Sequence, residues 1–353
     1  MPAPASASRH YRRLQRLAGI TIAAARRSWR KMDPARNWEQ QYQEEGGIGA
    51  ELALLAGAAQ IAAVRESDSY MANVLTELAI GPLTQPGVLN PQRFLGAMGD
   101  GRPVETLLEH TVVKAGQSFN ESIAKAGGKM TAQIPAVFDR EKAAADALES
   151  AGKFLDQIMH EVVAETARAA ESAALVQREW VEGWARMLNP PSCSRCVILA
   201  GQFYLWNEGF DRHPGCDCLH IPWSEKDDND PRVNPELYFE SLTPDQQDKI
   251  FTKAGAKAVR DGADLNQVVN ARRGMATAAQ NARGWIPKGR LIRDEEFGVF
   301  TTTEGTTKRG RANRKKTGRN ATFRLMPESI YEIAGDDRAE AIRLLKLHGF
   351  ILP

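Results

Sequence analysis

The sequence contains few cysteines, no long uninterrupted apolar run and almost no net charge. Four cysteines in 353 residues are too few to cross-link a secreted protein of this size, so we expect a reducing compartment. Residues 1–8 lack the apolar core of a signal peptide. The longest apolar stretch, Gly49–Val64, is interrupted by Glu51 and Gln60 and is shorter than the ~20 residues that span a bilayer. We therefore expect a soluble protein that has no membrane partner.

Composition and length indicate a folded protein of more than one domain. The 46 Lys and Arg residues are nearly balanced by 44 Asp and Glu residues, and a formal charge of +2 excludes a global field that attracts polyanions. Hydrophobic residues make up 42% and charged residues 25% of the chain, which excludes wholesale disorder. At about 150 residues per domain, the length allows two or three domains.

Helical periodicity dominates the first half of the chain. Apolar residues recur three or four positions apart in the stretches His10–Met32, Ile48–Leu78 and Pro103–Ala124. Each stretch has one apolar stripe to bury, which favours a helical bundle over residues 1–136. The other face of the first stretch is either a solvated surface or a contact for an acidic partner or nucleic acid. That face carries Arg12, Arg13, Arg16, Arg26, Arg27, Arg30 and Lys31.

A longer helical pattern follows, over residues Asp139–Met187. It contains no proline, and the prolines of Asn189–Pro191 stop it. At ~1.5 Å per residue, one such helix is on the order of 70 Å long, and we expect it to connect domains over residues 137–191. A kink near Gly152 is the main alternative. Trp180 and Trp184 fall on the apolar side of this predicted helix.

The character of the chain changes after residue 191. We expect a small α+β module rich in Cys and His over residues 192–300, a basic flexible arm over residues 301–322, and a helical segment over residues 323–353. Within the module, Thr243 with Gln246 predicts a capped helix start, and Gly262 with Asp264 predicts a helix end and the next cap. The predicted fold class is therefore mainly α: a helical N-terminal bundle and one long helix, then the module and the helical C-terminal segment.

All four cysteines lie within 26 residues, as a C-x-x-C pair followed by a C-x-C pair. A C-x-x-C turn can aim two thiolates at one point, and a second pair of ligands ~20 residues later can complete a tetrahedral zinc site. The ligands of such a structural zinc would be Cys193, Cys196 and two of His213, Cys216 and Cys218. One alternative is a clamp of cysteines without metal. Another is a catalytic zinc, which four protein ligands disfavour because they leave no position for water. His220 fits a hydrogen-bonding side chain better than a ligand.

The order of motifs after residue 191 extends beyond the cysteines. The C-x-x-C pair precedes the aromatic stretch Gly201–Tyr204 and Phe210, and an H-P-x-C-x-C motif beginning at His213 precedes Pro222. This order resembles the Mu F-like minor head proteins of tailed bacteriophages. Other stretches resemble the version found in phages of actinobacteria: Trp29–Met32, Tyr238–Phe239, Thr243–Phe251, Gly262–Asp264, Val268–Met275, Arg324–Pro327 and Leu347–Phe350.

This resemblance covers most of the chain, and its specific part is Ser192–Met275. It implies a head-morphogenesis protein that is encoded beside the portal and lies inside the capsid or at its vertex. The implied partners are the portal protein and the major capsid or scaffold protein. The implied location is the host cytoplasm during assembly and then the prohead interior or virion head.

Proteins of this type are often labelled capsid maturation proteases, so a protease is the first alternative function. A serine protease needs a nucleophile beside a base and oxyanion donors, and the sequence has no G-x-S-x-G elbow. His160 and Glu161 are not followed by the second histidine of an H-E-x-x-H helix. A cysteine protease can pair Cys193 or Cys196 with His213, but the clustering of the cysteines favours a clamp or a metal. The sequence thus favours a non-enzymatic role.

Two basic features are candidate contacts with a partner. The predicted arm has seven cations after Glu304 and no interleaved aromatic residue, so its contact with packaged DNA would be sequence-blind. An acidic protein surface is another partner, and a solubilising linker is the alternative. The arm cations are Lys308, Arg309, Arg311, Arg314, Lys315, Lys316 and Arg319. Arg272 and Arg273 can bind a phosphate or carboxylate of a partner, with a structural role as the alternative. A zinc-dependent, non-specific nucleic-acid-binding module is the second alternative function.

Overall fold

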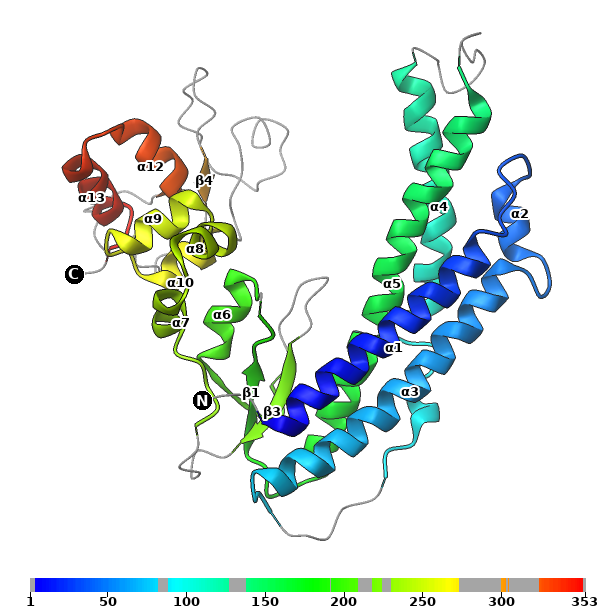
Figure 1. Cartoon of the computed structure of the whole chain (residues 1–353), viewed down its shortest axis with the longest axis horizontal. Coiled ribbons are helices and arrows are strands. Elements are labelled where there is room, and N and C mark those ends of the chain that lie inside the picture. The colour runs from blue at the N-terminus through cyan, green and yellow to red at the C-terminus, as the bar shows by residue number, and fades with distance from the viewer. Residues whose placement is uncertain are drawn as a thin grey trace. The chain divides into compact units, whose positions relative to one another are not determined.

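The chain forms two compact units in this computed structural model (Figure 1). The structure describes residues 4–81, 88–126, 138–190, 192–208, 218–223, 230–272, 300–302, 304 and 324–351. Unit 1 comprises residues 1–187 and 203–231, and unit 2 comprises residues 188–202 and 232–353. The fold is mainly helical with a few short strands, which confirms the predicted fold class.

Four long helices build most of unit 1. They are α1 (Ala5–Trp29), α3 (Ile48–Glu77), α4 (Val104–Lys125) and α5 (Arg140–Val176), and the short elements α2 (Trp38–Gln43) and η1 (Pro91–Phe94) lie between them in the sequence. Helices α1, α3 and α4 confirm the three stretches that periodicity predicts. Helices α3 and α5 each pack against the other three, so this pair forms the centre of the bundle (Figure 1).

Helix α3 shows how the bundle accommodates a polar group. Gln60 is fully buried, and its amide nitrogen donates to the carbonyl oxygen of Ala97 at 2.8 Å and to Oγ1 of Thr166 at 3.3 Å. Its amide oxygen accepts the backbone N–H of Gly96 at 2.9 Å. Within the described ranges, α3 is the one helix long and apolar enough to cross a bilayer by length and composition. In unit 1 it packs against α1, α4 and α5.

Helix α5 is shorter than predicted. It begins after Asp139, whose side chain caps it, and it ends at Val176 rather than at Met187. Two turns follow, and the chain then continues as strand β1 (Gly183–Met187). Trp184 therefore lies on a strand, where strand pairing and ring stacking outweigh the helical spacing that suggested one continuous helix.

Gly152, where a kink was the alternative, does not end the helix, because α5 continues through this residue. A Cβ atom at position 152 would lie 1.4 Å from Nη1 of Arg26 and 3.2 Å from Cδ1 of Trp29. Gly152 therefore provides the space in which α1 approaches α5, and its role is close packing.

A small antiparallel sheet completes unit 1. It has the order β2-β1-β3, where β2 is Phe203–Leu205 and β3 is Leu219–Trp223. Trp184 of β1 lies opposite Tyr204 on one side and Pro222 on the other. All residues of β1 and β3 are buried. Trp184 and Ile221 join the same core cluster as Val163 of α5, so the sheet shares its core with the bundle.

Unit 2 consists mainly of short helices. They are α6 (Ser194–Ala200), α7 (Pro235–Ser241), α8 (Pro244–Phe251), α9 (Lys253–Arg260), α10 (Leu265–Ala271), α12 (Pro327–Ala334) and α13 (Arg338–Leu347). The predicted capping box is present at Thr243, and the predicted cap at Asp264 accepts the N–H of Gln267. Gly262 has a φ of +97°, which explains why a glycine ends this run.

The first two residues of the predicted arm form a strand. Thr301 and Thr302 form strand β4, which pairs antiparallel with β5 (Arg324–Leu325). Thr302 is buried, and its hydroxyl donates to the carbonyl oxygen of Ala271. A pairing across more than 20 residues is not readable from local composition. The cations of the arm, residues 308–319, lie outside the described residues, and β4 and β5 hold the two ends of the segment together.

Candidate functional site

The predicted zinc ligands fall partly outside the described residues, where His213 and Cys216 lie. Cys193 caps helix α6 in unit 2, and its Sγ accepts the backbone N–H of Cys196 at 3.4 Å. Cys196 is buried in unit 2, and Cys218 is buried in unit 1. No disulfide joins any two of the three described cysteines. Over the described ranges, no group of three or more His, Cys, Asp and Glu side chains can hold a metal ion. The zinc site stays a prediction.

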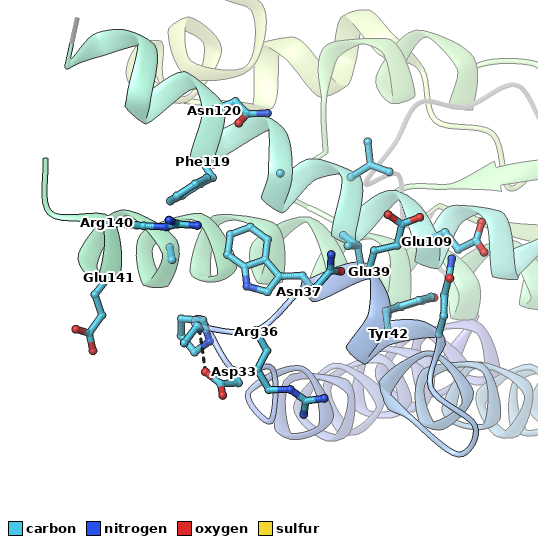
Figure 2. Close-up of a pocket in the computed structure, with 18 residues that line it drawn as sticks. Asp33, Arg36, Asn37, Glu39, Tyr42, Glu109, Phe119, Asn120, Arg140 and Glu141 are labelled. Atoms are coloured by element: carbon cyan, nitrogen blue, oxygen red, sulfur yellow. Dashed lines mark hydrogen bonds between the residues drawn. The ribbon is translucent and has the colours of Figure 1, made fainter. Parts of the chain in front are cut away.

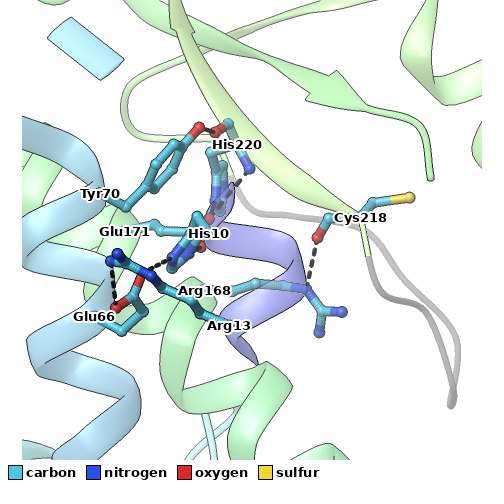
Figure 3. Close-up of polar contacts among 8 residues, drawn as sticks. All are labelled: His10, Arg13, Glu66, Tyr70, Arg168, Glu171, Cys218 and His220. Atoms are coloured by element: carbon cyan, nitrogen blue, oxygen red, sulfur yellow. Dashed lines mark hydrogen bonds and ion pairs between the residues drawn. The ribbon is translucent and has the colours of Figure 1, made fainter. Parts of the chain in front are cut away.

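A buried ion-pair network in unit 1 is the most polar cluster of its core (Figure 3). Glu171 of α5 lies at its centre. Its Oε1 is 3.0 Å from Nε2 of His10, and its Oε2 is 2.6 Å from Nδ1 of His220. The backbone N–H of His220 donates to the same Oε2 at 3.1 Å. This confirms the prediction that His220 is a hydrogen-bonding side chain.

Helix α3 extends the network with Glu66 and Tyr70 (Figure 3). Oε1 of Glu66 is 3.3 Å from Nδ1 of His10, and Glu66 also pairs with Arg13 at 3.3 Å. The Tyr70 ring stacks on the His10 ring at 4.2 Å between centroids, and its hydroxyl donates to the carbonyl oxygen of His220 at 2.5 Å. The network therefore ties α1, α3 and α5 to strand β3.

The pKa values of the three central groups follow from burial and hydrogen bonding. Burial raises the pKa of Glu171, but hydrogen bonds from His10 and His220 outweigh it and hold the pKa at about 2. Burial lowers the pKa of His10, but its bonds to Glu171 and Glu66 outweigh burial and raise the pKa above 6.5. Burial dominates at His220 and lowers its pKa in spite of the bond to Glu171. The surroundings thus favour the carboxylate of Glu171, shift His10 towards its charged form and shift His220 towards its neutral form.

This cluster fits a structural role. A catalytic acid or base has to reach its substrate, and the side chains of His10, Glu171 and His220 are at most 1% exposed. Trp184 closes the cluster on the sheet side, with its ring 4.2 Å from the His220 ring and 4.3 Å from the Tyr204 ring. Buried charges are tolerated only when they are paired, and Glu171 has three hydrogen-bond donors.

The predicted partner contact at Arg272 is engaged within unit 2. Nη2 of Arg272 pairs with the carboxylate of Glu328 and donates to Oγ1 of Thr252 at 2.7 Å. Thr252 has a φ of +67° and joins α8 to α9, so Arg272 braces a strained junction. This arrangement favours the structural alternative for Arg272. Arg273 lies outside the described residues.

The basic side chains of α1 and of Arg30 and Lys31, which directly follow it, divide into two groups. Arg13, Arg26 and Lys31 form ion pairs with acidic residues of neighbouring helices. A second group is exposed and forms neither a hydrogen bond nor an ion pair with any described residue; its members are Arg9, Arg12, Arg16, Arg27 and Arg30. Sequence reasoning identified a basic face, but it could not separate these two groups, because their partners lie on other helices.

A wide groove opens beside α2 in unit 1 (Figure 2). It has a volume of about 1030 Å³ and is lined by residues 33–43, α4 and the first turn and a half of α5. Trp38 and Phe119 meet edge to face at 5.7 Å, while Glu39, Glu109 and Glu141 lie along the groove. Burial, followed by the charges of Glu109 and Glu105, raises the pKa of Tyr42, so its phenol stays protonated. The groove combines aromatic and acidic groups with Arg36 and Arg140, but nothing in the described residues identifies what fills it.

Sequence reasoning missed both Glu171 and the groove. One local signal for Glu171 was present: it falls on the apolar side of α5, between Ala167 and Ala174. An acidic residue in such a stripe needs a buried partner. Its partners His10 and His220 are 161 and 49 residues away in the sequence, so their identity was not readable from local pattern.

Comparison with known proteins found no family model, no curated protein and no solved structure that matches the chain.

Proposed function

We propose that this chain is a minor head protein of a tailed bacteriophage that acts in head morphogenesis by binding other proteins. The Mu F-like order of motifs in Ser192–Met275 suggests this function. The main support is where the titratable and charged side chains of unit 1 lie. The cluster around Glu171 most resembles catalytic side chains, and it is buried in the core, where no substrate can reach it. The exposed cations of α1 and the groove beside α2 are instead open to solvent and can bind a partner.

The architecture suits a protein that holds partners rather than converts substrates. Helices α3 and α5 span 30 and 37 residues, so at ~1.5 Å per residue they are about 45 and 55 Å long. They present long, rigid faces. The portal protein and the major capsid or scaffold protein are the proposed partners, in the host cytoplasm during assembly and in the prohead or virion head afterwards. The basic arm at residues 308–319 is proposed to contact an acidic protein surface or packaged DNA.

Zinc belongs to this proposal as a structural ion. A thiolate at Cys193 can accept the N–H of Cys196, as Sγ of Cys193 does here, and this bond orients the C-x-x-C pair. When bound, the ion would supply rigidity to the chain after residue 191. Elemental analysis of the reduced full-length protein should find about one zinc per chain, and the double variant Cys193→Ser, Cys196→Ser should lose it. If the wild-type protein contained no zinc, the zinc site would be refuted and the alternative, a clamp of cysteines without metal, would be supported.

Coexpression with the proposed portal and major capsid partners tests the function directly. We expect the chain to copurify with at least one of them while all proteins keep their full length. Cleavage of the capsid or scaffold protein would instead support the maturation protease, particularly if Cys193→Ser abolished it. The absence of both association and cleavage would overturn the proposal.

The groove offers a matched pair of variants for this experiment. Val113 is 53% exposed and lines the groove, so Val113→Glu should weaken an association that uses it. Leu54 of α3 is also apolar and 75% exposed but lies outside the groove, so Leu54→Glu is the control.

A further inference from the structure

Helix α1 has an unusual charge composition. Over its 25 residues it contains six arginines and no acidic residue, and Arg30 and Lys31 follow directly. Like charges three or four residues apart on a helix repel each other. Pairs of this kind are Arg9 with Arg12, Arg12 with Arg16, and Arg27 with Arg30. The helix therefore accepts a repulsion that its own sequence does not offset.

Neighbouring helices neutralise only the flanks of this charge. Arg26 is 2.6 Å from Glu149 and 3.6 Å from Asp156, and Lys31 is 2.6 Å from Glu51. These pairs attach α1 to α5 and α3. Arg12, Arg16 and Arg27 are exposed and have no such pair among the described residues. Their charge is available to an external anion.

The exposed arginines form one long stripe, in which Arg9 and Arg30 also interact electrostatically with Glu77 and Asp156. Positions 9, 12 and 16 follow the three- and four-residue spacing that keeps side chains on one helix face, and positions 27 and 30 return to that face three turns later. From Arg9 to Arg30 the stripe is about 32 Å long at ~1.5 Å per residue. One turn of B-form DNA is about 34 Å long. The stripe can therefore follow a phosphate backbone over most of a helical turn.

The chemistry of the stripe distinguishes between polyanions. Guanidinium groups match the geometry of phosphate oxygens and bind them through two hydrogen bonds. The exposed residues of α1 include no aromatic side chain, so a single strand would find no stacking platform. The apolar face of α1, with Leu14 and Trp29, is buried in the bundle and cannot insert into a membrane.

A protein partner fits this face less well than a duplex. Protein interfaces draw most of their binding energy from a few buried anchors, and an arginine serves as one only when a well-packed pocket of the partner buries it and pairs its charge. The exposed face offers Ile20, which is 62% exposed, as its single large apolar side chain. A phosphate backbone needs only correctly spaced cations.

We propose that the exposed face of α1 binds duplex DNA through its phosphate backbone, without sequence preference. The residues that make these contacts are Arg9, Arg12, Arg16, Arg27 and Arg30. This surface is separate from the arm at residues 308–319, and the proposal does not depend on whether the arm contacts DNA. It is also independent of the copurification test above, because that test measures binding to portal and capsid proteins.

The test compares two triple variants of the full chain that lose the same charge. Arg12→Gln, Arg16→Gln and Arg27→Gln remove unpaired cations of the stripe. Arg36→Gln, Arg102→Gln and Lys142→Gln remove exposed cations elsewhere in unit 1 that pair with Glu44, Asp100 and Asp146. Binding to a mixed-sequence duplex of about 30 base pairs is measured by fluorescence anisotropy over a range of salt concentrations, and circular dichroism confirms that both variants fold.

We expect the stripe variant to bind about 100-fold more weakly at about 0.15 M salt, with a salt slope smaller by about 3, because each lost phosphate contact removes about 0.9 from the slope. The control should keep its affinity within about threefold. The proposal is overturned if wild-type protein does not bind the duplex or if both variants lose affinity equally. It is also overturned if the stripe variant binds DNA normally but fails to copurify with a capsid or scaffold protein, which would identify an acidic protein as the partner.

Discussion

The inner and outer faces of helix α1 differ in whether their basic side chains have acidic partners. On the inner face, His10 is 1% exposed and lies between the carboxylates of Glu171 and Glu66. On the outer face, Arg12 and Arg16 are exposed and have no acidic partner among the described residues. The comparison teaches that charge composition alone does not reveal a function. The inner charge is neutralised by the fold and holds it together, whereas the outer charge is left for a partner.

The largest effect is expected at the centre of the inner face. Glu171→Gln keeps the shape of the side chain but removes the more deeply buried of the two carboxylates that pair with His10. Breaking a buried ion pair from one side costs about 3–5 kcal/mol, so the free energy of unfolding should fall by that amount. Urea denaturation followed by circular dichroism measures it. A loss below about 1 kcal/mol would mean that the network contributes little to the fold.

A substitution at Trp184 tests how tightly the small sheet packs against the network around Glu171. Trp184→Ala should lower the free energy of unfolding by about 3–5 kcal/mol, because the ring is 1% exposed, stacks on Tyr204 and meets His220 edge to face. The matched change Trp180→Ala should cost less, because Trp180 is only partly buried. Equal costs in the same urea titration would contradict the placement of Trp184 in the core.

The pH dependence of stability should reflect the opposite shifts of the inner groups. The pKa of His220 is lowered, so the unfolded chain binds its proton more readily, and stability falls as the pH drops below about 6.5. Glu171, with a folded pKa of about 2, contributes stability that is present above its ordinary value and is lost as the pH falls towards about 2. The raised pKa of His10 acts in the other direction: its contribution is complete below about 6.5 and is lost as the pH rises through the folded value.

Unfolding midpoints measured in small pH steps check this prediction. Wild-type stability should decline on both sides of its maximum, and His220→Asn should flatten the decline that begins below about pH 6.5. If His220→Asn and the wild type lost stability equally below about pH 6.5, the lowered pKa of His220 would not be the cause of that loss.

The smallest effect on stability is expected on the outer face. Neutralising Arg12 and Arg16 together removes one repulsive pair, which should leave the free energy of unfolding unchanged or raise it by about 0.2–0.5 kcal/mol. Thermal and urea unfolding of this double variant provide the measurement. A loss above about 1 kcal/mol would show that these arginines have structural partners, and the contrast between the two faces would disappear.

Local signals made much of the fold readable from the sequence. The spacing of apolar residues in α1, α3 and α4 reports a helix turn by turn, and the caps at Thr243 and Asp264 involve groups only three residues away. The end of α5 was not readable, because β1 depends on pairing with residues 203–205 and 219–223. Pairing at that separation leaves no periodic trace in β1 itself, and Trp184 was therefore assigned to the helix.

The candidate sites were predictable to a smaller degree. The basic face of α1 was evident, yet its division into paired and unpaired arginines depends on Glu66, Glu149 and Glu51 on other helices. The role of His220 followed from local context, but its partner Glu171 was not identified. Residue type thus indicated which side chains are polar or charged. Only the tertiary structure showed which of them already have a hydrogen-bond or ion-pair partner within the protein.

One paired measurement tests the contrast between the faces most directly: the free energy of unfolding and the affinity for duplex DNA, each determined for Glu171→Gln and for the triple variant of Arg12, Arg16 and Arg27. We expect Glu171→Gln to lose stability. Under conditions in which this variant is still folded, it should keep its DNA affinity. We expect the triple variant to lose affinity and to keep its stability. If either variant changed both properties in parallel, or if the two effects were exchanged, the account would be contradicted.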